Sequence, residues 1–313
     1  MIAYTFRRML LAIPVMGVVA VAVFGLLYLA PGDPALVIAG DTATPDQVER
    51  IRHVLHLDES PVIRFAHWVW RLLQGDFGTS IFSSEPVLRE IGQRAGATVS
   101  LIVLASLIAI LIGVPFGILA AQRKGGGWDR ALGAYGVFGF STPSFVIAYL
   151  LAFLFASKLH WLPVQGFQPI SSGLIPFLRT AMLPSLSLSI VFAALIASVT
   201  RSSMIETLGQ DYIRTAIAKG VGSTAILFRH ALRNAAIPIV TIIGNGIPVL
   251  IGGAVVVESI FVVPGIGSLT VDAILHRDYP VIQAVVLISS LTYVLANLAI
   301  DLAYTLLDPR IRY

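Results

Sequence analysis

Cysteine is absent from this sequence of 313 residues, and charged residues make up only 12% of it. Without cysteine the chain has no disulfide framework, no thiolate metal site and no thiol nucleophile. An average soluble domain carries about 25% charged residues. Because 57% of the residues are hydrophobic, the composition predicts a polytopic membrane protein.

Motifs that carry catalysis are also missing. The chain has only three lysines, which precede Gly125, Leu159 and Gly220, so no GxxxxGK[ST] phosphate loop exists. There is no HExxH, no GxSxG and no close pair of acids in the apolar segments. We therefore expect a chain that is not an enzyme by itself, holds no catalytic residue, metal or cofactor, and hydrolyses no ATP through a phosphate loop.

The apolar runs predict the architecture. Six charge-free stretches reach the roughly 20 residues that a membrane-crossing helix needs. They are Met9–Gly32, Ala95–Gln122, Ala131–Ser157, Thr180–Thr200, Asn234–Val257 and Tyr279–Ile300. The first is too long for a signal peptide and lacks a good cleavage site, so we expect an uncleaved helix. A further charge-free stretch, Leu159–Leu178, contains three prolines and two glycines and is expected to be a loop. In the third span, Pro143 should kink or interrupt the helix.

The distribution of basic residues predicts the orientation. With the N-terminus inside, more than half of the 21 Lys and Arg fall in the cytoplasmic segments, and the others are spread over longer outer loops. The positive-inside rule thus favours two cytoplasmic termini. The sequence pI of about 9.5 reflects this excess facing anionic lipid, and we expect no nucleic-acid partner.

The predicted fold class is an all-α polytopic membrane protein with six transmembrane helices. Residues 1–32 form the first helix, residues 33–94 an external helical segment, and residues 95–313 a core of five helices. In the external segment, Thr44, Pro45 and Gln47 match a capping box, followed by an apolar stripe at Val48, Ile51 and Leu55. A second helix should begin at Ser60–Pro61 and end at the sequence GDFGTSI, residues 75–81. A metal site at its histidines (His53, His56, His67) lacks further ligands and is disfavoured.

The fifth span is unusually rich in helix breakers and small residues. It contains Gly244, Asn245, Gly246, Pro248, Gly252 and Gly253. Together they suggest a helix that lines a pathway or moves, and we name Gly244, Asn245, Pro248, Gly252 and Gly253 as candidate pathway residues. For any single residue, close packing between helices is an equally good explanation. In the sixth span, Asn297 and Asp301 share a face, and we favour a structural role because Asp301 lies near the helix end.

Residues 211–233, here called the elbow, place four basic residues between the fourth and fifth spans: Arg214, Lys219, Arg229 and Arg233. Asp211 can cap a short helix, Lys219 suits its C-terminal end, and Gly220 stands where a left-handed residue is expected. Ser223 can cap the next helix. The residues alone leave two interpretations open: an amphipathic helix on anionic lipid, or a docking element for another protein.

The sequence of this region resembles that of a known family. The sequence RTAIAKGVGSTAILFRHALRNAAIP, within about 203–236, is similar to the EAA-type loop of permease subunits of ATP-binding-cassette (ABC) importers, in the dipeptide/oligopeptide/nickel branch. Of the general pattern, Ala216, Gly220 and Leu232 match strictly. Segments along nearly the whole chain resemble the same branch in order and spacing, among them APGDPA, GDFGTS, TRSSMIETLGQDYIRTA, GGAVVVESIFVVPGIG and LDPRIR.

The resemblance implies an importer of the bacterial inner membrane. It implies a second permease subunit, expected to be a homologue in a heterodimer, with a homodimer left open by the residues. It also implies two cytoplasmic ATPases that bind ATP and Mg, and an extracytoplasmic substrate-binding protein. The elbow would be the coupling helix, seated on an ATPase. The residues expected to make that contact are Asp211, Tyr212, Arg214, Thr215, Ala216, Lys219 and Gly220.

The substrate and two other functional classes remain open. Di- or oligopeptides are the expected cargo, with nickel or glutathione as alternatives in the same family. A stand-alone secondary transporter would show an inverted repeat, which is not visible here. A non-transporting scaffold is disfavoured by the fifth span and by the resemblance.

Overall fold

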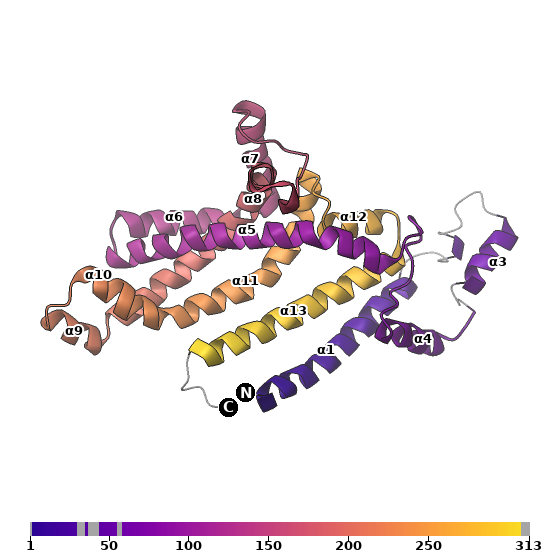
Figure 1. Cartoon of the computed structure of the whole chain (residues 1–313), viewed down its shortest axis with the longest axis horizontal. Helices are drawn as coiled ribbons and strands as arrows, with labels where there is room; N and C mark the ends of the chain where they lie inside the picture. Colours follow the sequence, from indigo (N-terminus) through magenta and orange to yellow (C-terminus); the bar gives the residue numbers. More distant parts are fainter. Residues whose placement is uncertain (1, 30–34, 37–43, 55–57, 308–313) are drawn as a thin grey trace. The chain divides into compact units, whose positions relative to one another are not determined.

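The computed structural model describes residues 2–29, 35–36, 44–54 and 58–307. The described residues form helices and no strand, which confirms the all-α prediction. They fall into two compact units, each with its own contacts. Figure 1 labels the helices, coloured in the order of the chain. Unit 1 contains residues 96–268 and the end of the last helix, and unit 2 contains residues 2–95 and 269–295.

Unit 1 is built around one long helix, α8 (Leu174–Leu208), which packs against α6 (Gly127–Ser141), α7 (Ser144–Leu151) and α11 (Leu232–Phe261). The helix α5 (Val87–Gln122) lies directly on α8 through two glycines that are four residues apart. A methyl group at Gly113 would lie 2.8 Å from the carbonyl oxygen of Ala193, and one at Gly117 would lie 2.6 Å from that of Ala197. Small residues at this spacing let two membrane helices approach backbone to backbone.

The third predicted span is broken. After α6 the chain bends by 104° at Thr142–Pro143, and α7 continues into a π-helix, η1 (Ala152–Lys158). Pro143 precedes the new helix, where its missing N–H costs no hydrogen bond, so the predicted interruption is confirmed. Five helices are long and apolar enough to cross a membrane, and the described chain has six spans if the bent pair counts as one.

The stretch predicted as a loop is partly helical. Residues 159–173 are irregular apart from a 3₁₀ turn, η2 (Ile170–Ser172). The prediction is wrong for residues 174–178, because α8 already begins at Leu174. Pro176 lies in its first turn, where a backbone N–H has no helical acceptor, so a proline there does not prevent a helix. Helices also extend beyond the apolar stretches elsewhere: α8 runs on to Leu208, and α11 to Phe261.

In unit 2, α4 (Pro61–Leu73) packs on α1 (Ile2–Leu29), while α3 (Pro45–Val54) precedes α4 in the chain. The backbone N–H of Thr44 donates to Gln47 Oε1 at 2.9 Å, which confirms Gln47 as the capping-box partner. Ser60 and Pro61 begin α4 as predicted, and Gly75 ends it with a φ of +81°. Of the predicted α3 stripe, Val48 is buried, and Leu55, like His56, lies outside the described residues.

The segment after α4 is held by a buried carboxylate between α12 (Ile266–Leu275) and α13 (Tyr279–Leu307). Asp278 is 3% exposed and accepts hydrogen bonds from Ser80 Oγ and, at 3.2 Å, from the backbone N–H of Ile81. A carboxylate that accepts backbone hydrogen bonds fixes an otherwise irregular loop. The GDFGTSI sequence is therefore a rigid turn within unit 2.

Candidate functional site

The elbow folds as a short helix, a glycine turn and a return into α11. Its first part, α9, spans Asp211–Ala218, followed by α10 (Ser223–Ala225) and a π-helix, η3 (Ile226–Ala231). Gln210 and Gly222 occupy the N-cap positions, so the caps predicted at Asp211 and Ser223 are each wrong by one residue. Asp211 still lies in the first turn, where its negative charge suits the helix dipole.

Gly220 completes the C-terminal cap of α9. Its φ is +78°, as predicted for a left-handed residue. The backbone N–H of Val221 donates to the Ala216 carbonyl at 3.1 Å, and that of Gly220 to the Ile217 carbonyl at 2.9 Å. This pair of bonds is a Schellman motif, which ends the helix and reverses the chain. Apart from the adjacent residues of the chain, no described heavy atom lies within 4 Å of where a side chain at Gly220 would begin, so glycine is required there for its conformation and not for lack of space.

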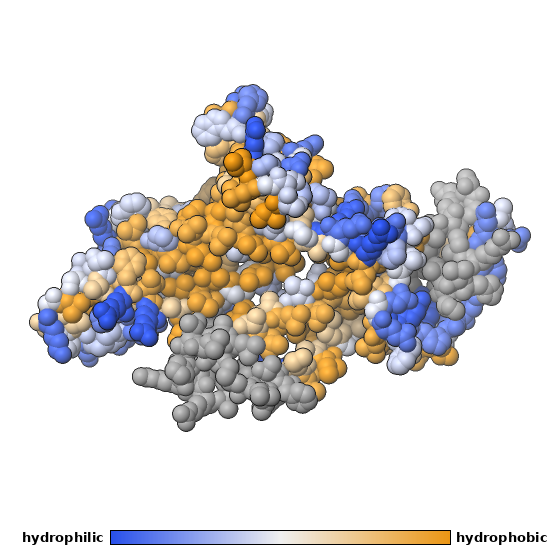
Figure 2. All heavy atoms as spheres, in the orientation of Figure 1, coloured by the Kyte–Doolittle hydropathy of each residue, from blue (hydrophilic) through white to orange (hydrophobic). Residues whose placement is uncertain are grey.

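One face of α9 is anchored and the rest is exposed. Ile213 is 1% exposed, and Ala216 is half-buried. The other candidate coupling residues are all exposed: Asp211, Tyr212, Arg214, Thr215, Lys219 and Gly220. In Figure 2 hydrophilic residues gather at the left edge of the view, where Figure 1 labels α9. The helix is thus held by a single buried side chain and presents its charges outward.

Two apolar side chains also lie exposed on the elbow, although the sequence reading did not select them. Ile217 is 57% exposed on α9, and Phe228 is 58% exposed on η3. Single exposed apolar residues are ordinary on protein surfaces, so these two gain meaning only from their place on the elbow. The signal in the sequence was a large apolar residue on the solvent face of a short basic helix.

The elbow is joined to α11 by a hydrogen bond and by an apolar cluster. Asn234 Nδ2 donates to the Tyr212 hydroxyl at 2.6 Å, which connects α9 with the first turn of α11. Below it, one cluster unites the ends of α5 and α8 with η3 and the start of α11. Its buried members are Ile118, Ala121, Met204, Leu227, Ala231, Ala235 and Ile239. Because interiors are close-packed, a displacement of the elbow displaces these helix ends with it.

An ion pair joins two further helices of the same unit. Arg201 of α8 binds both carboxylate oxygens of Asp129 in the first turn of α6, with Nη2 at 2.9 Å from Oδ2. The same carboxylate accepts the backbone N–H of Gly125 at 2.8 Å. A bidentate guanidinium–carboxylate pair fixes both distance and orientation. The start of α6 is therefore fixed to α8 two turns before α8 ends and the elbow begins.

The candidate pathway residues divide between two faces of α11. Gly244 is buried where a side chain would collide with Ile300 of α13, and Gly253 approaches Leu188 of α8. Pro248 is half-buried. Asn245 and Gly252 are exposed on one face, together with Val249, Val256 and Ser259. We call these five exposed residues the α11 stripe; their spacing of four, three, four and three residues follows one side of the helix.

Asn245 is the most informative member of the α11 stripe. It lies near the middle of the apolar helix, it is exposed, and its amide has no hydrogen bond to the part of the chain that the structure describes. A polar side chain at this depth is costly against hydrocarbon. The exposed amide therefore favours water or another protein over lipid beside Asn245.

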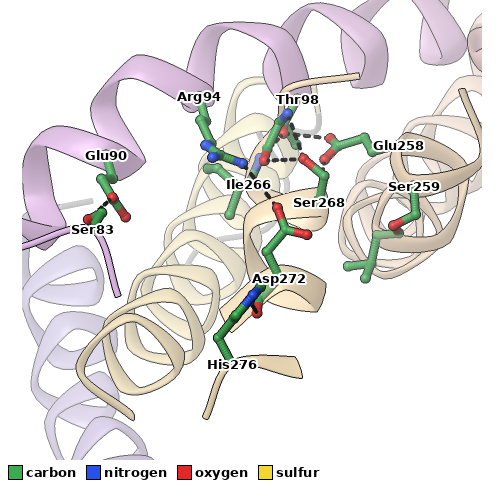
Figure 3. A network of polar contacts seen from close by, with 12 residues as sticks. Ser83, Glu90, Arg94, Thr98, Glu258, Ser259, Ile266, Ser268, Asp272 and His276 are labelled. Atoms are coloured by element: carbon green, nitrogen blue, oxygen red, sulfur yellow. Dashed lines mark hydrogen bonds and ion pairs between the residues drawn. The ribbon is translucent and has the colours of Figure 1, made fainter. Parts of the chain in front are cut away.

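The far end of α11 contains a buried acid that the sequence reading placed outside the membrane span. Glu258 is 0% exposed, accepts a hydrogen bond from Thr98 Oγ1 at 2.6 Å and accepts another from the backbone N–H of Ser268 at 3.0 Å (Figure 3). Thr98 Oγ1 in turn accepts the backbone N–H of Ile266 at 2.8 Å. The carboxylate thereby connects α5, the end of α11 and the N-terminus of α12.

The backbone around Glu258 leaves no space for a side chain at Gly265 or Gly267. A methyl group at Gly265 would collide with the carboxylate, and one at Gly267 would lie 2.5 Å from Val255 Cα and 2.8 Å from Glu258 Oε2. Val262 ends α11 in the left-handed region with a φ of +52°. The sequence VESIFVVPGIGS thus packs closely around one carboxylate, and we call this segment the Glu258 loop. Its partners lie up to 160 residues apart, and no local pattern predicts them.

Metal binding has no support within the described ranges. No group of three His, Cys, Asp or Glu residues there could hold an ion. His67 contacts Glu59 at 3.2 Å on the exposed side of α4, while His56 is outside the ranges described.

Comparison with known proteins identifies relatives along the whole chain. Residues 113–313 match the family described as "Binding-protein-dependent transport system inner membrane component", and residues 1–102 match its N-terminal domain. The "Probable peptide ABC transporter permease protein y4tP" of Sinorhizobium fredii is 51% identical over 310 residues, with 99% of each chain covered. The "Glutathione transport system permease protein GsiC" of Salmonella typhimurium is 42% identical over 313 residues, with 100% of each chain covered.

Proposed function

The chain belongs to the inner-membrane components of binding-protein-dependent transport systems, and within this family of ABC permeases we propose that it imports di- or oligopeptides. The elbow is the observation that carries the mechanism. A short helix held by one buried residue and joined to α11 can receive a displacement from another protein and pass it on. The cargo is proposed from the peptide permease that is 51% identical to this chain.

Coupling begins at the exposed face of α9. We place a cytoplasmic ATPase against Asp211, Tyr212, Arg214, Thr215, Ala216, Lys219 and Gly220, with Ile217 as an apolar contact beside them. ATP-driven closure of two such ATPases moves α9 as a rigid body, because the Schellman cap fixes its end. The hydrogen bond from Asn234 to Tyr212 and the apolar cluster then displace α11 and α8. ATP and Mg reside on the ATPases, and the chain itself needs no cofactor.

Alternating access follows from tilting α11. The α11 stripe is uncharged, mixes small, polar and aliphatic side chains, and has an exposed amide near its middle. Such a surface suits a wet path for a peptide, whose backbone offers amide donors and acceptors throughout. Of the candidate pathway residues, Asn245 and Gly252 would face the peptide. Gly244 and Gly253 would let α11 slide against α13 and α8, since both stand at close helix contacts.

The remaining partners complete the proposal. A second homologous permease would supply the opposite wall of the path, and an extracytoplasmic binding protein would deliver the peptide. Both termini would lie in the cytoplasm of a bacterium and the chain in its inner membrane, with the basic elbow on the same side as the ATPases. Glutathione is the second candidate cargo, because it is itself a tripeptide and a glutathione permease is 42% identical over 313 residues.

Purification from native membranes in mild detergent tests the assembly. We expect the tagged chain to elute with a second permease and two phosphate-loop ATPases. Elution of the chain alone, repeated in lipid nanodiscs and without an ATPase in any fraction, would contradict the proposal.

The absence of cysteine allows a direct test of the path. Asn245→Cys introduces a unique thiol on the α11 stripe, and Ala254→Cys introduces one on the opposite, buried face. We expect a water-soluble thiol reagent to modify position 245 in the assembled importer, and transported peptide to slow that modification. Position 254 should stay unmodified. Equal protection of both thiols would place the α11 stripe in lipid or in a dry interface instead.

A further inference from the structure

The helix α4 carries three different surfaces around its 13 residues. The first is polar and consists of Arg64, His67 and Arg71, which recur at helical spacing. The second is aromatic: Phe65 and Trp68 are half-buried, and their rings lie 5.3 Å and 5.5 Å from that of Phe24 on α1. The third is apolar and exposed. We call it the α4 stripe, and its members are Val62, Ile63, Ala66, Trp70 and Leu73.

The α4 stripe is exposed to a degree that water does not favour. Val62 is 77% exposed, Leu73 76%, Trp70 63% and Ile63 51%. Single exposed apolar residues are ordinary on protein surfaces, but a contiguous stripe marks a contact surface. None of the described residues covers it.

The contact with α1 shows at which depth α4 lies. Phe24 lies five residues before the last residue of α1, which at 1.5 Å per residue is about 8 Å from the C-terminal end of that helix. Because α4 packs on Phe24, it lies beside the last two turns of a membrane helix, close to the level where hydrocarbon gives way to head groups. Tryptophan is enriched at this level, since its ring is apolar and its N–H is polar.

The order of the three surfaces agrees with that depth. With 100° between successive residues, the aromatic contact lies between the polar surface on one side and Val69 on the other, and the α4 stripe lies across the helix from Arg71. When the polar surface faces water, the aromatic surface points sideways to α1 and the α4 stripe points into the membrane. Arg64 holds its guanidinium carbon 5.6 Å from the Phe24 ring, at the junction of the first two surfaces.

We infer that α4 lies in the plane of the membrane surface and that the lipid around α1 covers the α4 stripe. The occupant is lipid because α4 packs on a helix whose length and composition allow it to cross a membrane. On α1, Val15, Val18 and Val21 are 51%, 70% and 59% exposed, on the same membrane helix that α4 packs against. Interfacial helices bury their apolar face about 5–10 Å into the boundary between head groups and acyl chains. The inference does not depend on coupling to an ATPase, and it fixes the segment between the first two spans against the bilayer.

Spin labels on the cysteine-free chain test this inference. Leu73→Cys places a unique label on the α4 stripe, and Arg71→Cys places one on the polar surface of the same helix turn. The full-length chain is reconstituted in vesicles of phosphatidylcholine and phosphatidylglycerol. Collision rates are then measured with oxygen, which concentrates in the bilayer, and with a water-soluble nickel chelate.

We expect the label at position 73 to collide more with oxygen than with the nickel chelate, and the label at position 71 to show the opposite preference. Val62→Cys, at the other end of the α4 stripe, should behave like position 73, so misfolding of one variant does not decide the result. Equal contact of both labels with the nickel chelate would overturn the inference. Protection of position 73 from both reagents would also overturn it, because protein rather than lipid would then cover the α4 stripe.

Discussion

At its first residues α11 joins a largely exposed elbow, whereas at its last residues it closes around a fully buried carboxylate. On α9 a single side chain, Ile213, is fully buried, and Gly220 stands in open space with a positive φ. In the Glu258 loop, Gly265 and Gly267 have no space for a side chain. Glycine is thus required at the elbow for its backbone conformation, because the chain reverses there. Beside Glu258 it is required because no side chain fits.

Under the proposed mechanism, the two ends of α11 have different parts in transport. A surface that must bind another protein has to stay exposed, and it needs only enough anchoring to move as one body. An end that must follow that movement without unfolding needs dense hydrogen bonding. Under the proposed mechanism, α11 would transmit a displacement from the exposed elbow to the closely packed segment around Glu258.

Replacing Glu258 should have the largest effect on stability. In Glu258→Ala, Thr98 Oγ1 and the backbone N–H of Ser268 lose a buried acceptor, at about 1–3 kcal/mol for each group. We expect a clear fall in the melting temperature of the purified protein. Ser259→Ala is the matched control, since Ser259 is exposed on the next position and bonds only within its own helix turn in the described structure (Figure 3). Equal melting temperatures for the two variants would remove the contrast between the two ends.

Proline at Gly220 should affect coupling more than stability. Proline fixes φ near −65°, so it cannot adopt the +78° of Gly220, and it removes the N–H that donates to the Ile217 carbonyl. We expect Gly220→Pro to insert into the membrane and to lose most peptide uptake, while ATP hydrolysis by the assembled complex continues.

Gly222→Pro provides the control for this variant. Gly222 has a φ of −63°, which proline adopts, and no atom lies within 4 Å of a side chain there. Uptake should be largely retained. If both proline variants transported equally well, the shape of the elbow would not matter for coupling.

A smaller effect is expected from the hydrogen bond between α9 and α11. Tyr212→Phe removes the hydroxyl that accepts from Asn234, a bond worth about 0.5–1.5 kcal/mol where it is well formed. We expect fewer peptides transported for each ATP hydrolysed. Asn234→Ala should cause the same defect, and the double variant should be no worse than either single one. Additive defects would mean that the two side chains act separately.

Much of the elbow could be predicted from its own residues. The acidic first turn, the basic end and the glycine are local signals, so α9 and the left-handed turn at Gly220 were placed within one residue. The family resemblance added the expected partner. Ile217 and Phe228 could not be singled out from the sequence, because apolar residues are common throughout the chain and only the fold shows which of them are exposed.

The Glu258 loop could not be predicted, for a physical reason. A lone acid after an apolar stretch is typical of a residue at the water boundary, so the sequence predicts a span that ends at Val257. Its burial depends on Thr98, which is distant in sequence, and on glycines whose tight contacts exist only in the folded chain. Likewise, nothing local separates Gly244, which packs against α13, from Gly252, which is exposed.

The central claim is that the exposed face of α9 binds an ATPase, and photo-crosslinking tests it most directly. A photoreactive amino acid at position 217 replaces an exposed side chain, and one at position 213 replaces the buried anchor on the same helix. After illumination of native membranes, we predict that position 217 yields an adduct containing a phosphate-loop ATPase and that position 213 yields none. Adducts with lipid alone at position 217, in membranes that hold the assembled transporter, would contradict the account.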